Sequence, residues 1–313
     1  MLPYISVIIT AHNRKEFLER SIKSALNQTL AREFYEIIVI KNFADAEIDN
    51  LIKQNGVYSI RVTDNSKIGE DLSLGIENAR GNVLSFLDDD DEFLPNKLET
   101  IYNVFKSDRE IIYYHNHQII DGSKRNKIVN KIFKGVYCTD ELVDRFKSII
   151  NSHGLASLYF NMSSISIRKS YYIDYIKKLK MLIIEPDDFF FFIGLERGHK
   201  FYFDDVVLTK YMIHESLSNP EGTVYNKAEY FMKNYELMIK FANATGYISS
   251  LVRYREIREI LEARRDLQLL SSIIYHRRID LALWLKCMAN AKKYGFRLTA
   301  FSLFFIYVTI VKL

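Results

Sequence analysis

Four consecutive aspartates are the residues of this chain best suited to chemistry. Directly after the apolar run 83–87 the sequence has Asp88, Asp89, Asp90 and Asp91. Adjacent like charges repel one another, and they are tolerated where a cation or a helix N-terminus compensates them. Mg²⁺ and Mn²⁺ prefer carboxylate oxygens and often bridge a protein to phosphate groups through one or two carboxylates. The run therefore predicts a divalent-cation site, with Asp91 or the following Glu92 expected only to cap the helix near Pro95.

A second acidic group and a late histidine could move protons or contact phosphate. The run Glu185-Pro186-Asp187-Asp188 precedes a stretch of phenylalanines, and one of its two aspartates is expected to cap a helix. His214 follows another apolar run, where a neutral imidazole could bind a metal and a protonated one could pair with phosphate. Cys138 and Cys287 lie far apart and form no CxxC pair or disulfide framework.

The elements that position these residues alternate between β-rich and helical patterns over the first two hundred residues. Short apolar runs predict strands at 6–10, 36–40, 59–62 and 83–87, and amphipathic stretches between them predict helices. Further strands, partly antiparallel, are expected at 111–114, 163–167, 201–203 and 207–211. Continuous apolar runs of this kind suit parallel strands that are covered on both faces. Ligand sites in such sheets lie at the carboxyl ends of strands, which is where the aspartates stand.

The pattern changes after residue 226. The remaining residues contain no proline and only two glycines, with more basic than acidic side chains, and they end in an uncharged apolar run from 298 to 311. We therefore expect a catalytic domain over residues 1–222, with a nucleotide-binding half at 1–110 and an acceptor half at 111–222. Residues 223–313 are expected to form a basic, aromatic-rich helical region with an apolar tail.

Composition and missing motifs exclude several classes of protein. The formal net charge of +4 is small for a chain of 313 residues and gives no reason to expect nucleic-acid binding. The N-terminus lacks the pattern of a signal peptide, so a cytoplasmic location is expected. No G-x-G-x-x-G sequence follows any predicted strand, which argues against a dehydrogenase. The segment 10–14 contains no glycine, which argues against a nucleotidyltransferase.

Three blocks in the same order resemble family 2 glycosyltransferases with the GT-A fold. They are 6–14 together with 24–28, then 69–99, and finally 189–218, which ends in Tyr-Met-Ile-His-Glu-Ser-Leu-Ser. The resemblance covers about 215 residues. It implies an α/β fold, a Rossmann-like GT-A sheet of the nucleotide-diphospho-sugar transferases with flanking helices, here carrying a C-terminal helical appendage. It also implies an inverting, metal-dependent transfer of a sugar from a UDP- or GDP-sugar to an acceptor hydroxyl, with Mn²⁺ or Mg²⁺ as cofactor, in the assembly of a glycan, surface polysaccharide or glycoprotein.

The same resemblance assigns roles to individual residues. Asp88 or Asp89 would face the ribose and Asp90 would coordinate the metal, while His214 lies in a motif that folds over the diphosphate and is a second candidate metal ligand. The nucleoside pocket would include Thr10, Ala11, Asn13 and Arg14.

One segment departs from the family. An acidic pair that contacts the base usually follows the second strand, and this chain has Lys41-Asn42-Phe43-Ala44 there. Asn42 could still hydrogen-bond a base edge, because an amide both donates and accepts, and Asp64 after the third strand could contribute. The identity of the nucleotide is therefore left open by the sequence.

The catalytic base that the family places before a late helix is assigned to Asp187, with Asp188 as a close second and Glu185 third. Such a base removes the proton of the acceptor hydroxyl as the oxygen attacks the anomeric carbon.

The C-terminal region leaves alternatives open. Residues 251–313 could lie along the cytoplasmic face of a membrane, because basic side chains with interspersed aromatic and apolar ones suit anionic headgroups. They could equally pack on one another or form an oligomer contact. A membrane location would favour a lipid-linked or growing glycan acceptor. The competing functions are a polyprenyl-phosphate glycosyltransferase, which needs no base, and a non-catalytic membrane or assembly adaptor with an inherited GT-A fold.

Overall fold

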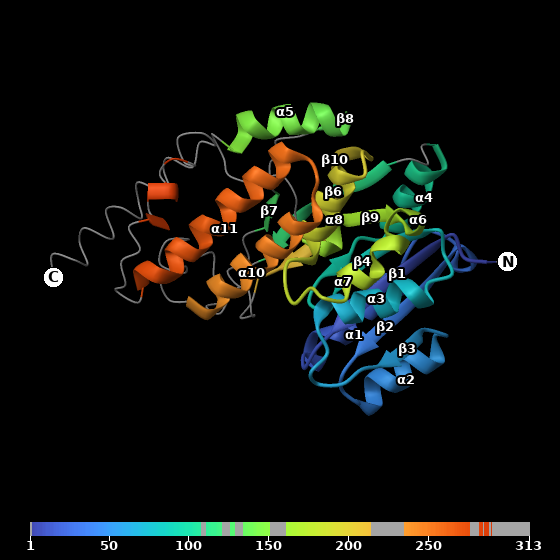
Figure 1. Cartoon of the computed structure of the whole chain (residues 1–313). Helices are drawn as coiled ribbons and strands as arrows, with labels where there is room; N and C mark the ends of the chain where they lie inside the picture. The colour runs from blue at the N-terminus through green and yellow to red at the C-terminus, as the bar shows by residue number, and fades with distance from the viewer. Residues whose placement is uncertain are drawn as a thin grey trace. The chain divides into compact units, whose positions relative to one another are not determined.

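The computed structural model describes residues 2–107, 111–120, 126–128, 134–150, 161–213 and 235–275, together with 282–283, 285–287 and 289. The chain divides into two compact units, each built from several segments (Figure 1). The first unit comprises Met1–Tyr137, Leu158–Asp187 and His199–His214. The second comprises Cys138–Ser157, Asp188–Gly198 and Glu215–Leu313.

One mixed sheet forms the centre of the first unit. Its main path runs in the order β3-β2-β1-β4-β9-β6-β10-β5. The parallel half consists of β1 (Ile5–Ala11), β2 (Tyr35–Lys41), β3 (Tyr58–Arg61) and β4 (Val83–Asp88). The other half contains β5 (Glu92–Phe93), β6 (Ile111–Ile120), β9 (Ile165–Arg168) and β10 (Lys200–Met212), with β7 (Asn126–Ile128) beside β6 and β8 (Gly135–Tyr137) beside β10.

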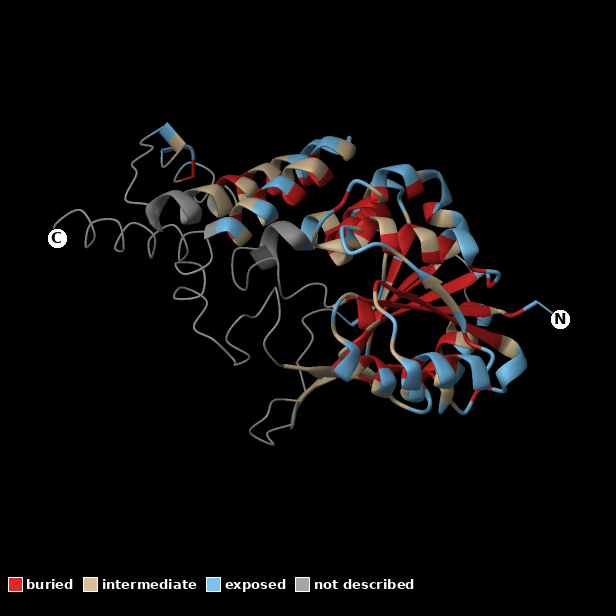
Figure 2. Ribbon diagram, turned by 90° about the horizontal axis from the view of Figure 1, so that it is seen from below, coloured by how far each residue is buried: buried red, intermediate tan, exposed pale blue. Residues whose placement is uncertain are grey.

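The parallel strands β1, β2 and β4 are largely buried, because helices cover both faces of this part of the sheet. All seven residues of β1 and all seven of β2 are buried, and Figure 2 shows the strands in red between helices with pale blue outer sides. One face packs against α1 (Lys15–Leu26), α2 (Ala46–Gln54) and α4 (Lys97–Ser107), whose apolar side chains join one core cluster with Ile5, Val7 and Ile9 of β1. The other face packs against α3 (Ile68–Asn78), where Gly75 comes so near that a Cβ would lie 2.6 Å from the Ile8 side chain.

The second half of the sheet is mixed, with β6 and β10 parallel and the other pairs antiparallel, and it is less regular than the sequence indicates. β10 is one long strand across the two predicted runs 201–203 and 207–211, and its pairing with β6 shifts register between Phe203 and Thr209. The strand predicted at 163–167 begins only at Ile165, because Met162–Ser164 form the 3-10 turn η3. Short segments complete this unit: η1 (Arg32–Phe34), α6 (Lys169–Tyr172), η4 (Ile173–Tyr175) and α7 (Ile176–Leu179).

Helices make up the described part of the second unit. They are α5 (Thr139–Ile150), α8 (Pro186–Glu196) from Asp188 onward, α10 (Tyr235–Leu251) and α11 (Arg255–Tyr275). The four phenylalanines of α8 are completely buried, and α10 packs against α11. The Glu196 carboxylate accepts hydrogen bonds from the backbone N–H groups of Arg253 (2.7 Å) and Tyr254 (3.1 Å), which fixes the connection between α10 and α11. Among the helices in the described ranges, none has the length and hydropathy that a membrane span requires.

Candidate active site

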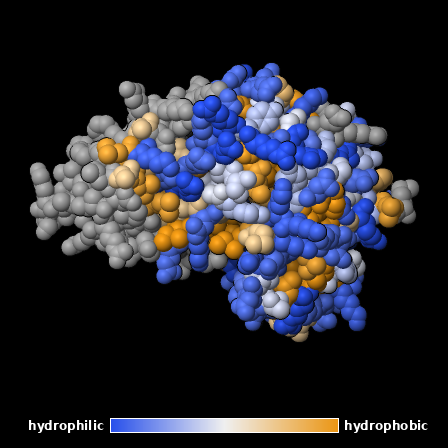
Figure 3. Space-filling view, viewed as in Figure 1, coloured by the Kyte–Doolittle hydropathy of each residue, from blue (hydrophilic) through white to orange (hydrophobic). Residues whose placement is uncertain are grey.

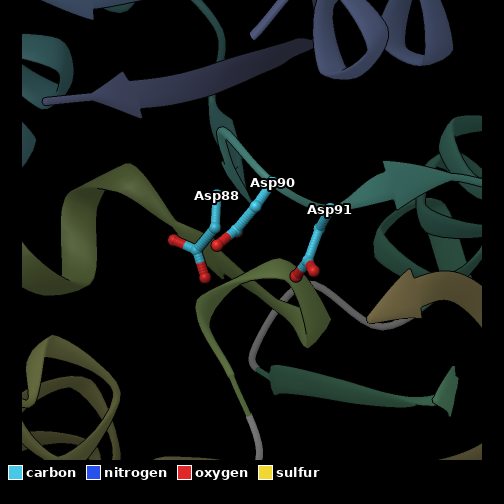
Figure 4. Close-up of side chains that lie close together, drawn as sticks. All are labelled: Asp88, Asp90 and Asp91. Carbon is cyan, nitrogen blue, oxygen red and sulfur yellow. The ribbon is translucent and has the colours of Figure 1, made fainter. Parts of the chain in front are cut away.

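The aspartate run leaves the sheet at the end of β4, beside the end of β1. Asp88 is the last residue of β4 and pairs in register with Thr10 of β1. Asp88, Asp90 and Asp91 each offer one carboxylate oxygen, and these oxygens lie within 4.8 Å of one another. Figure 4 shows the three side chains extending to the same side of the loop. Three hard oxygen ligands at this spacing can share one divalent cation.

Helix α1 holds the acidic loop through two serines. The Ser21 hydroxyl oxygen lies 2.6 Å from the carbonyl oxygens of both Asp89 and Asp91. The Ser24 hydroxyl accepts a hydrogen bond of 3.0 Å from the backbone N–H of Phe93. Helix α1 therefore stabilises the loop that carries the aspartates. Its serine side chains satisfy backbone groups that a tight loop leaves without strand or helix partners.

Arg14 pairs with two of the four aspartates. Its guanidinium makes a two-pronged ion pair with the Asp89 carboxylate, and its Nη1 donates to Asp90 Oδ2 at 2.7 Å. The Asp89 side chain has no exposed surface, whereas 14% of the Asp90 side chain is exposed. Asp89 is thus held inside the loop by Arg14, and Asp90 presents its carboxylate at the surface of the site.

Asp91 belongs to the cluster, which corrects the expectation that it or Glu92 caps the helix near Pro95. The short strand β5 separates these acids from α4, which begins only at Lys97. Asp91 is fully buried, and its Oδ1 accepts a hydrogen bond of 3.0 Å from the backbone N–H of Met212. Its Oδ2 has no hydrogen-bond partner among the described residues. Glu92 instead pairs with Arg20 and Lys210.

Lys97 is a buried cation beside the acids that the sequence analysis did not single out. It has no exposed surface, and its Nζ donates to the Ser163 carbonyl at 2.5 Å and to Thr209 Oγ1 at 3.2 Å. The ring of Phe93 lies 3.4 Å from Nζ, measured to its centroid. The Ser163 hydroxyl in turn accepts from the backbone N–H of Asp88 at 2.9 Å. A lysine so soon after Pro95 reads as an exposed helix-start residue, so only the tertiary packing identifies this one.

Burial dominates the electrostatics of the cluster. It raises the pKa of Asp88 to about 7, with Asp90 adding to the effect and Arg14 opposing it. Burial likewise raises the pKa of Asp89 to about 8 despite Arg14, and it raises the pKa of Asp91 well above the usual range. Carboxyl groups that are reluctant to ionise alone are stabilised as carboxylates by a bound cation. The three converging carboxylates and the Asp91 Oδ2, which has no hydrogen-bond partner among the described residues, therefore fit a divalent metal ion.

The ends of β1, β2 and β3 bring Asn13, Asn42 and Asp64 together. Asn42 Oδ1 accepts from the backbone N–H of Asn13 at 2.9 Å, and its Nδ2 donates to Asn13 Oδ1 at 2.8 Å and to Asp64 Oδ1 at 3.1 Å. Asn42 is buried and Asp64 is exposed. Asn13 adopts the left-handed conformation with φ of 59°, which asparagine tolerates better than most residues. Asn42 therefore orients the other two side chains.

The other residues assigned to the nucleoside pocket lie along β1. Thr10 and Ala11 are both buried, with exposed fractions of 9% and 2%. The unusual Lys41 is buried as well, and its Nζ lies 2.7 Å from an Asp49 carboxylate oxygen. Lys41 is therefore engaged by Asp49 and by the Phe43 carbonyl.

The two base candidates have different surroundings. Asp188 is buried in the second unit, where it forms an ion pair with Arg264 of α11. Asp187, at the end of a first-unit segment, is partly exposed. Glu185 has a φ of 59°, and Pro186 begins α8 directly after it. His214 lies outside the described residues.

Comparison with known proteins identifies the family. The model of "Glycosyl transferase family 2" matches residues 6–175, more than half of the chain. The chain belongs to glycosyl transferase family 2. An uncharacterized glycosyltransferase of Rickettsia prowazekii is 27% identical over 232 residues, which span 72% of this chain and 69% of that protein. The GalNAc(5)-diNAcBac-PP-undecaprenol beta-1,3-glucosyltransferase of Campylobacter jejuni is 33% identical over 105 residues, 32% of this chain and 34% of that enzyme.

Solved structures agree with this family assignment at the level of the fold. The crystal structure of S. aureus TarS 1–349 in complex with UDP-GlcNAc has a TM-score of 0.57 and 10% sequence identity, covering 99% of this chain and 92% of that one. A second, longer TarS structure aligns with 89% of this family 2 chain, and the match covers only 44% of that TarS chain. The first unit is therefore a GT-A sheet with flanking helices, as the three sequence blocks predict, and the family 2 chain is a glycosyltransferase.

Proposed function

We propose that this glycosyltransferase moves a sugar from a nucleoside-diphosphate sugar to an acceptor hydroxyl with inversion at the anomeric carbon. The observation that carries the proposal is the convergence of Asp88, Asp90 and Asp91 within 4.8 Å at the end of β4. This edge of an α/β sheet is where nucleotide ligands bind. A UDP- or GDP-sugar is the donor class that fits the family.

Mn²⁺ or Mg²⁺ is the proposed cofactor, held by Asp90 with Asp91 and Asp88 beside it. When bound, such a cation offsets the charge that develops on the departing nucleoside diphosphate. The buried Asp91 Oδ2, which has no hydrogen-bond partner among the described residues, supports this arrangement. Asp89 is proposed to act through Arg14, whose guanidinium it orients toward Asp90. Asp88 is then the acid best placed for the ribose.

The nucleoside is proposed to lie between the ends of β1 and β3, where Asn13, Asn42 and Asp64 meet and Thr10 lies near the end of β1. The amide of Asn42 already makes hydrogen bonds with Asn13 and Asp64. Because Asp64 is exposed, its carboxylate is the group able to accept a hydrogen bond from an N–H on the base edge. His214 stays a proposed ligand of the metal or of the diphosphate.

Asp187 is the proposed catalytic base. Its neighbour Asp188 is buried and paired with Arg264 inside the second unit, where an acceptor hydroxyl would have to displace that contact. The base takes the proton of the acceptor hydroxyl while that oxygen attacks the anomeric carbon and the bond to the diphosphate oxygen breaks. The acceptor is proposed to be a glycan carried by a lipid, as the name of the Campylobacter relative indicates for that enzyme.

Donor binding is tested by thermal shift with UDP, GDP, ADP and CMP, each with Mn²⁺, Mg²⁺ or EDTA. We expect one diphosphate to raise the melting temperature only with metal, and the Asp90→Asn protein to lose this effect. Asp205→Asn is the matched control, because Asp205 is an exposed aspartate of the same unit in a surface ion pair with Lys134. Stabilisation that is unchanged by EDTA, or equal in both variants, would contradict the metal role.

Transfer is then tested with the donor that binding identifies. Asp187→Ala is expected to reduce kcat by at least 100-fold, a typical loss for a general base, and to leave donor affinity unchanged. Full activity of Asp187→Ala would remove this residue from the mechanism. Absence of binding by any nucleotide would favour the non-catalytic adaptor.

A further inference from the structure

The segment 169–184 of the first unit is helical as far as Leu179, and four of its apolar side chains are buried against that unit. Tyr172, Ile176, Leu179 and Leu182 have exposed fractions of 1%, 5%, 1% and 1%. The spacing of the first three, four and three residues apart, is that of one helix face. These four buried side chains attach the segment to the first unit.

Backbone contacts with α3 fasten the segment firmly. The Gly69 N–H donates to the Leu182 carbonyl at 3.1 Å, and the Ser73 hydroxyl lies 3.3 Å from the Ile176 carbonyl oxygen. A Cβ on Gly69 would lie 2.0 Å from the Leu179 carbonyl oxygen, so only glycine allows this approach. These contacts hold the segment in a defined position on the first unit.

Three large apolar side chains of the same segment are exposed to solvent. Ile173, Met181 and Ile183 are exposed by 44%, 61% and 44%. They are three of the nine large hydrophobic residues that are exposed in the described part of the chain, and they fall within eleven residues of sequence. Clustered exposed apolar residues mark interaction surfaces more often than scattered ones do.

The same segment contains more lysines than acidic residues. The stretch 169–184 contains four lysines and one aspartate, a net charge of +3. Lys177 and Lys178 are exposed, and Lys178 Nζ lies 4.4 Å from the centroid of the Tyr175 ring. The nearby Lys180 pairs with Glu77 at 2.8 Å. Figure 3 shows this face of the molecule, on which hydrophobic and hydrophilic surface alternate.

We propose that the α7 face, formed by Ile173, Lys177, Lys178, Met181 and Ile183, binds the surface of an anionic lipid bilayer. Apolar side chains can enter the boundary between headgroups and acyl chains while lysines pair with lipid phosphates. The tyrosine beside Lys178 has the amphipathic character of residues at that boundary. The exposed Lys177 and Lys178 favour an anionic bilayer, because a neutral one offers no counter-charge. This contact is separate from the C-terminal region 251–313.

Vesicle co-sedimentation of the full chain tests the proposal. It compares vesicles of phosphatidylcholine alone with vesicles of phosphatidylcholine and phosphatidylglycerol, without donor or acceptor, so the outcome is independent of the proposed transfer reaction. The wild type is expected to bind only the mixed vesicles and to be released by salt. Lys177→Glu/Lys178→Glu should weaken binding at least thirtyfold, since each lysine near an anionic surface contributes about fivefold. Ile173→Ser/Met181→Ser/Ile183→Ser should also lose binding, and Lys177→Arg/Lys178→Arg should keep it.

The control is Lys53→Glu/Tyr58→Ser, which makes the same kinds of change at exposed residues elsewhere in the first unit. This variant should bind like the wild type, and circular dichroism should show that every variant is folded. Three results would overturn the proposal. They are failure of the wild type to bind mixed vesicles, loss of binding only in Phe304→Ser/Phe305→Ser of the C-terminal tail, and a change of oligomeric state in the serine variant with vesicle binding intact.

Discussion

Replacing the buried Lys97 by methionine tests whether a protein cation balances the acidic cluster. Methionine keeps most of the apolar stem and removes the charge that lies among Asp88, Asp91 and the Ser163 carbonyl. The electrostatic coupling of Lys97 is strongest to Asp91 and then to Asp88. The substitution therefore removes a charged donor from Ser163 and a positive charge from two buried carboxyl groups.

The magnitude follows from two opposing effects. A hydrogen bond from a charged donor contributes about 1.5–3 kcal/mol, and Lys97 makes two such bonds, to the Ser163 carbonyl and to Thr209 Oγ1. Removing Lys97 also relieves its own burial, which lowers its pKa well below the usual range. We expect a net loss of about 2–4 kcal/mol in the free energy of unfolding in EDTA. The cluster becomes more negative, so added Mn²⁺ should restore part of this loss.

Urea denaturation at neutral pH in EDTA and in Mn²⁺ measures this effect. Lys106→Met is the matched control, because Lys106 is an exposed lysine near the end of the same helix, and it should change stability by less than about 0.5 kcal/mol. If Lys97→Met is as stable as Lys106→Met in EDTA, the argument that Lys97 balances the acids is wrong. Equal losses with and without Mn²⁺ would show that Lys97 supports packing alone.

Three further predictions concern other parts of the chain. Arg264→Met leaves the buried Asp188 carboxylate without its guanidinium and should cost about 3–5 kcal/mol in urea denaturation; the double variant with Asp188→Asn should recover part of the loss, and additive losses would contradict the pairing. Because the pKa of Asp88 is raised to about 7 from an unfolded value of about 3.9, the metal-free protein should lose stability as pH rises between these values. Stabilisation by Mn²⁺ should accordingly be larger at pH 8 than at pH 5 in thermal shift, and equal stabilisation would refute the linkage. Gly69→Ala places a Cβ 2.0 Å from the Leu179 carbonyl oxygen and should destabilise the protein by more than about 1 kcal/mol, which thermal denaturation measures.

The positions along the chain of the main parallel strands were predictable from local patterns. The runs predicted at 6–10, 36–40 and 83–87 each lie inside an observed strand that is at most one residue longer at either end. Buried parallel strands need continuous apolar residues, and this requirement is visible in any single stretch of sequence. The placement of the aspartates at a strand end follows from chain adjacency alone, because the residues after β4 must leave the sheet at that edge.

Tertiary structure decided which of those aspartates serves which purpose. Four neighbouring carboxylates look alike in sequence, yet a tight turn sends Asp89 toward Arg14 and Asp91 toward the Met212 backbone, which are 75 and 121 residues away. The ion pair between Asp188 and Arg264 joins residues that are 76 positions apart in the sequence. It gives Asp188 surroundings different from those of Asp187, whereas the sequence supported only an order of preference between these two base candidates.

The physical reason is that position along the chain fixes only where the backbone of a residue lies relative to its own strand or helix. The direction and the partner of its side chain depend on distant parts of the chain that pack against it. The sequence by itself therefore determined the family, the strands and the edge of the sheet that carries the site. The folded chain decided the buried role of Lys97, the meeting of Asn42 with Asp64, and which aliphatic residues of the segment around α7 remain exposed.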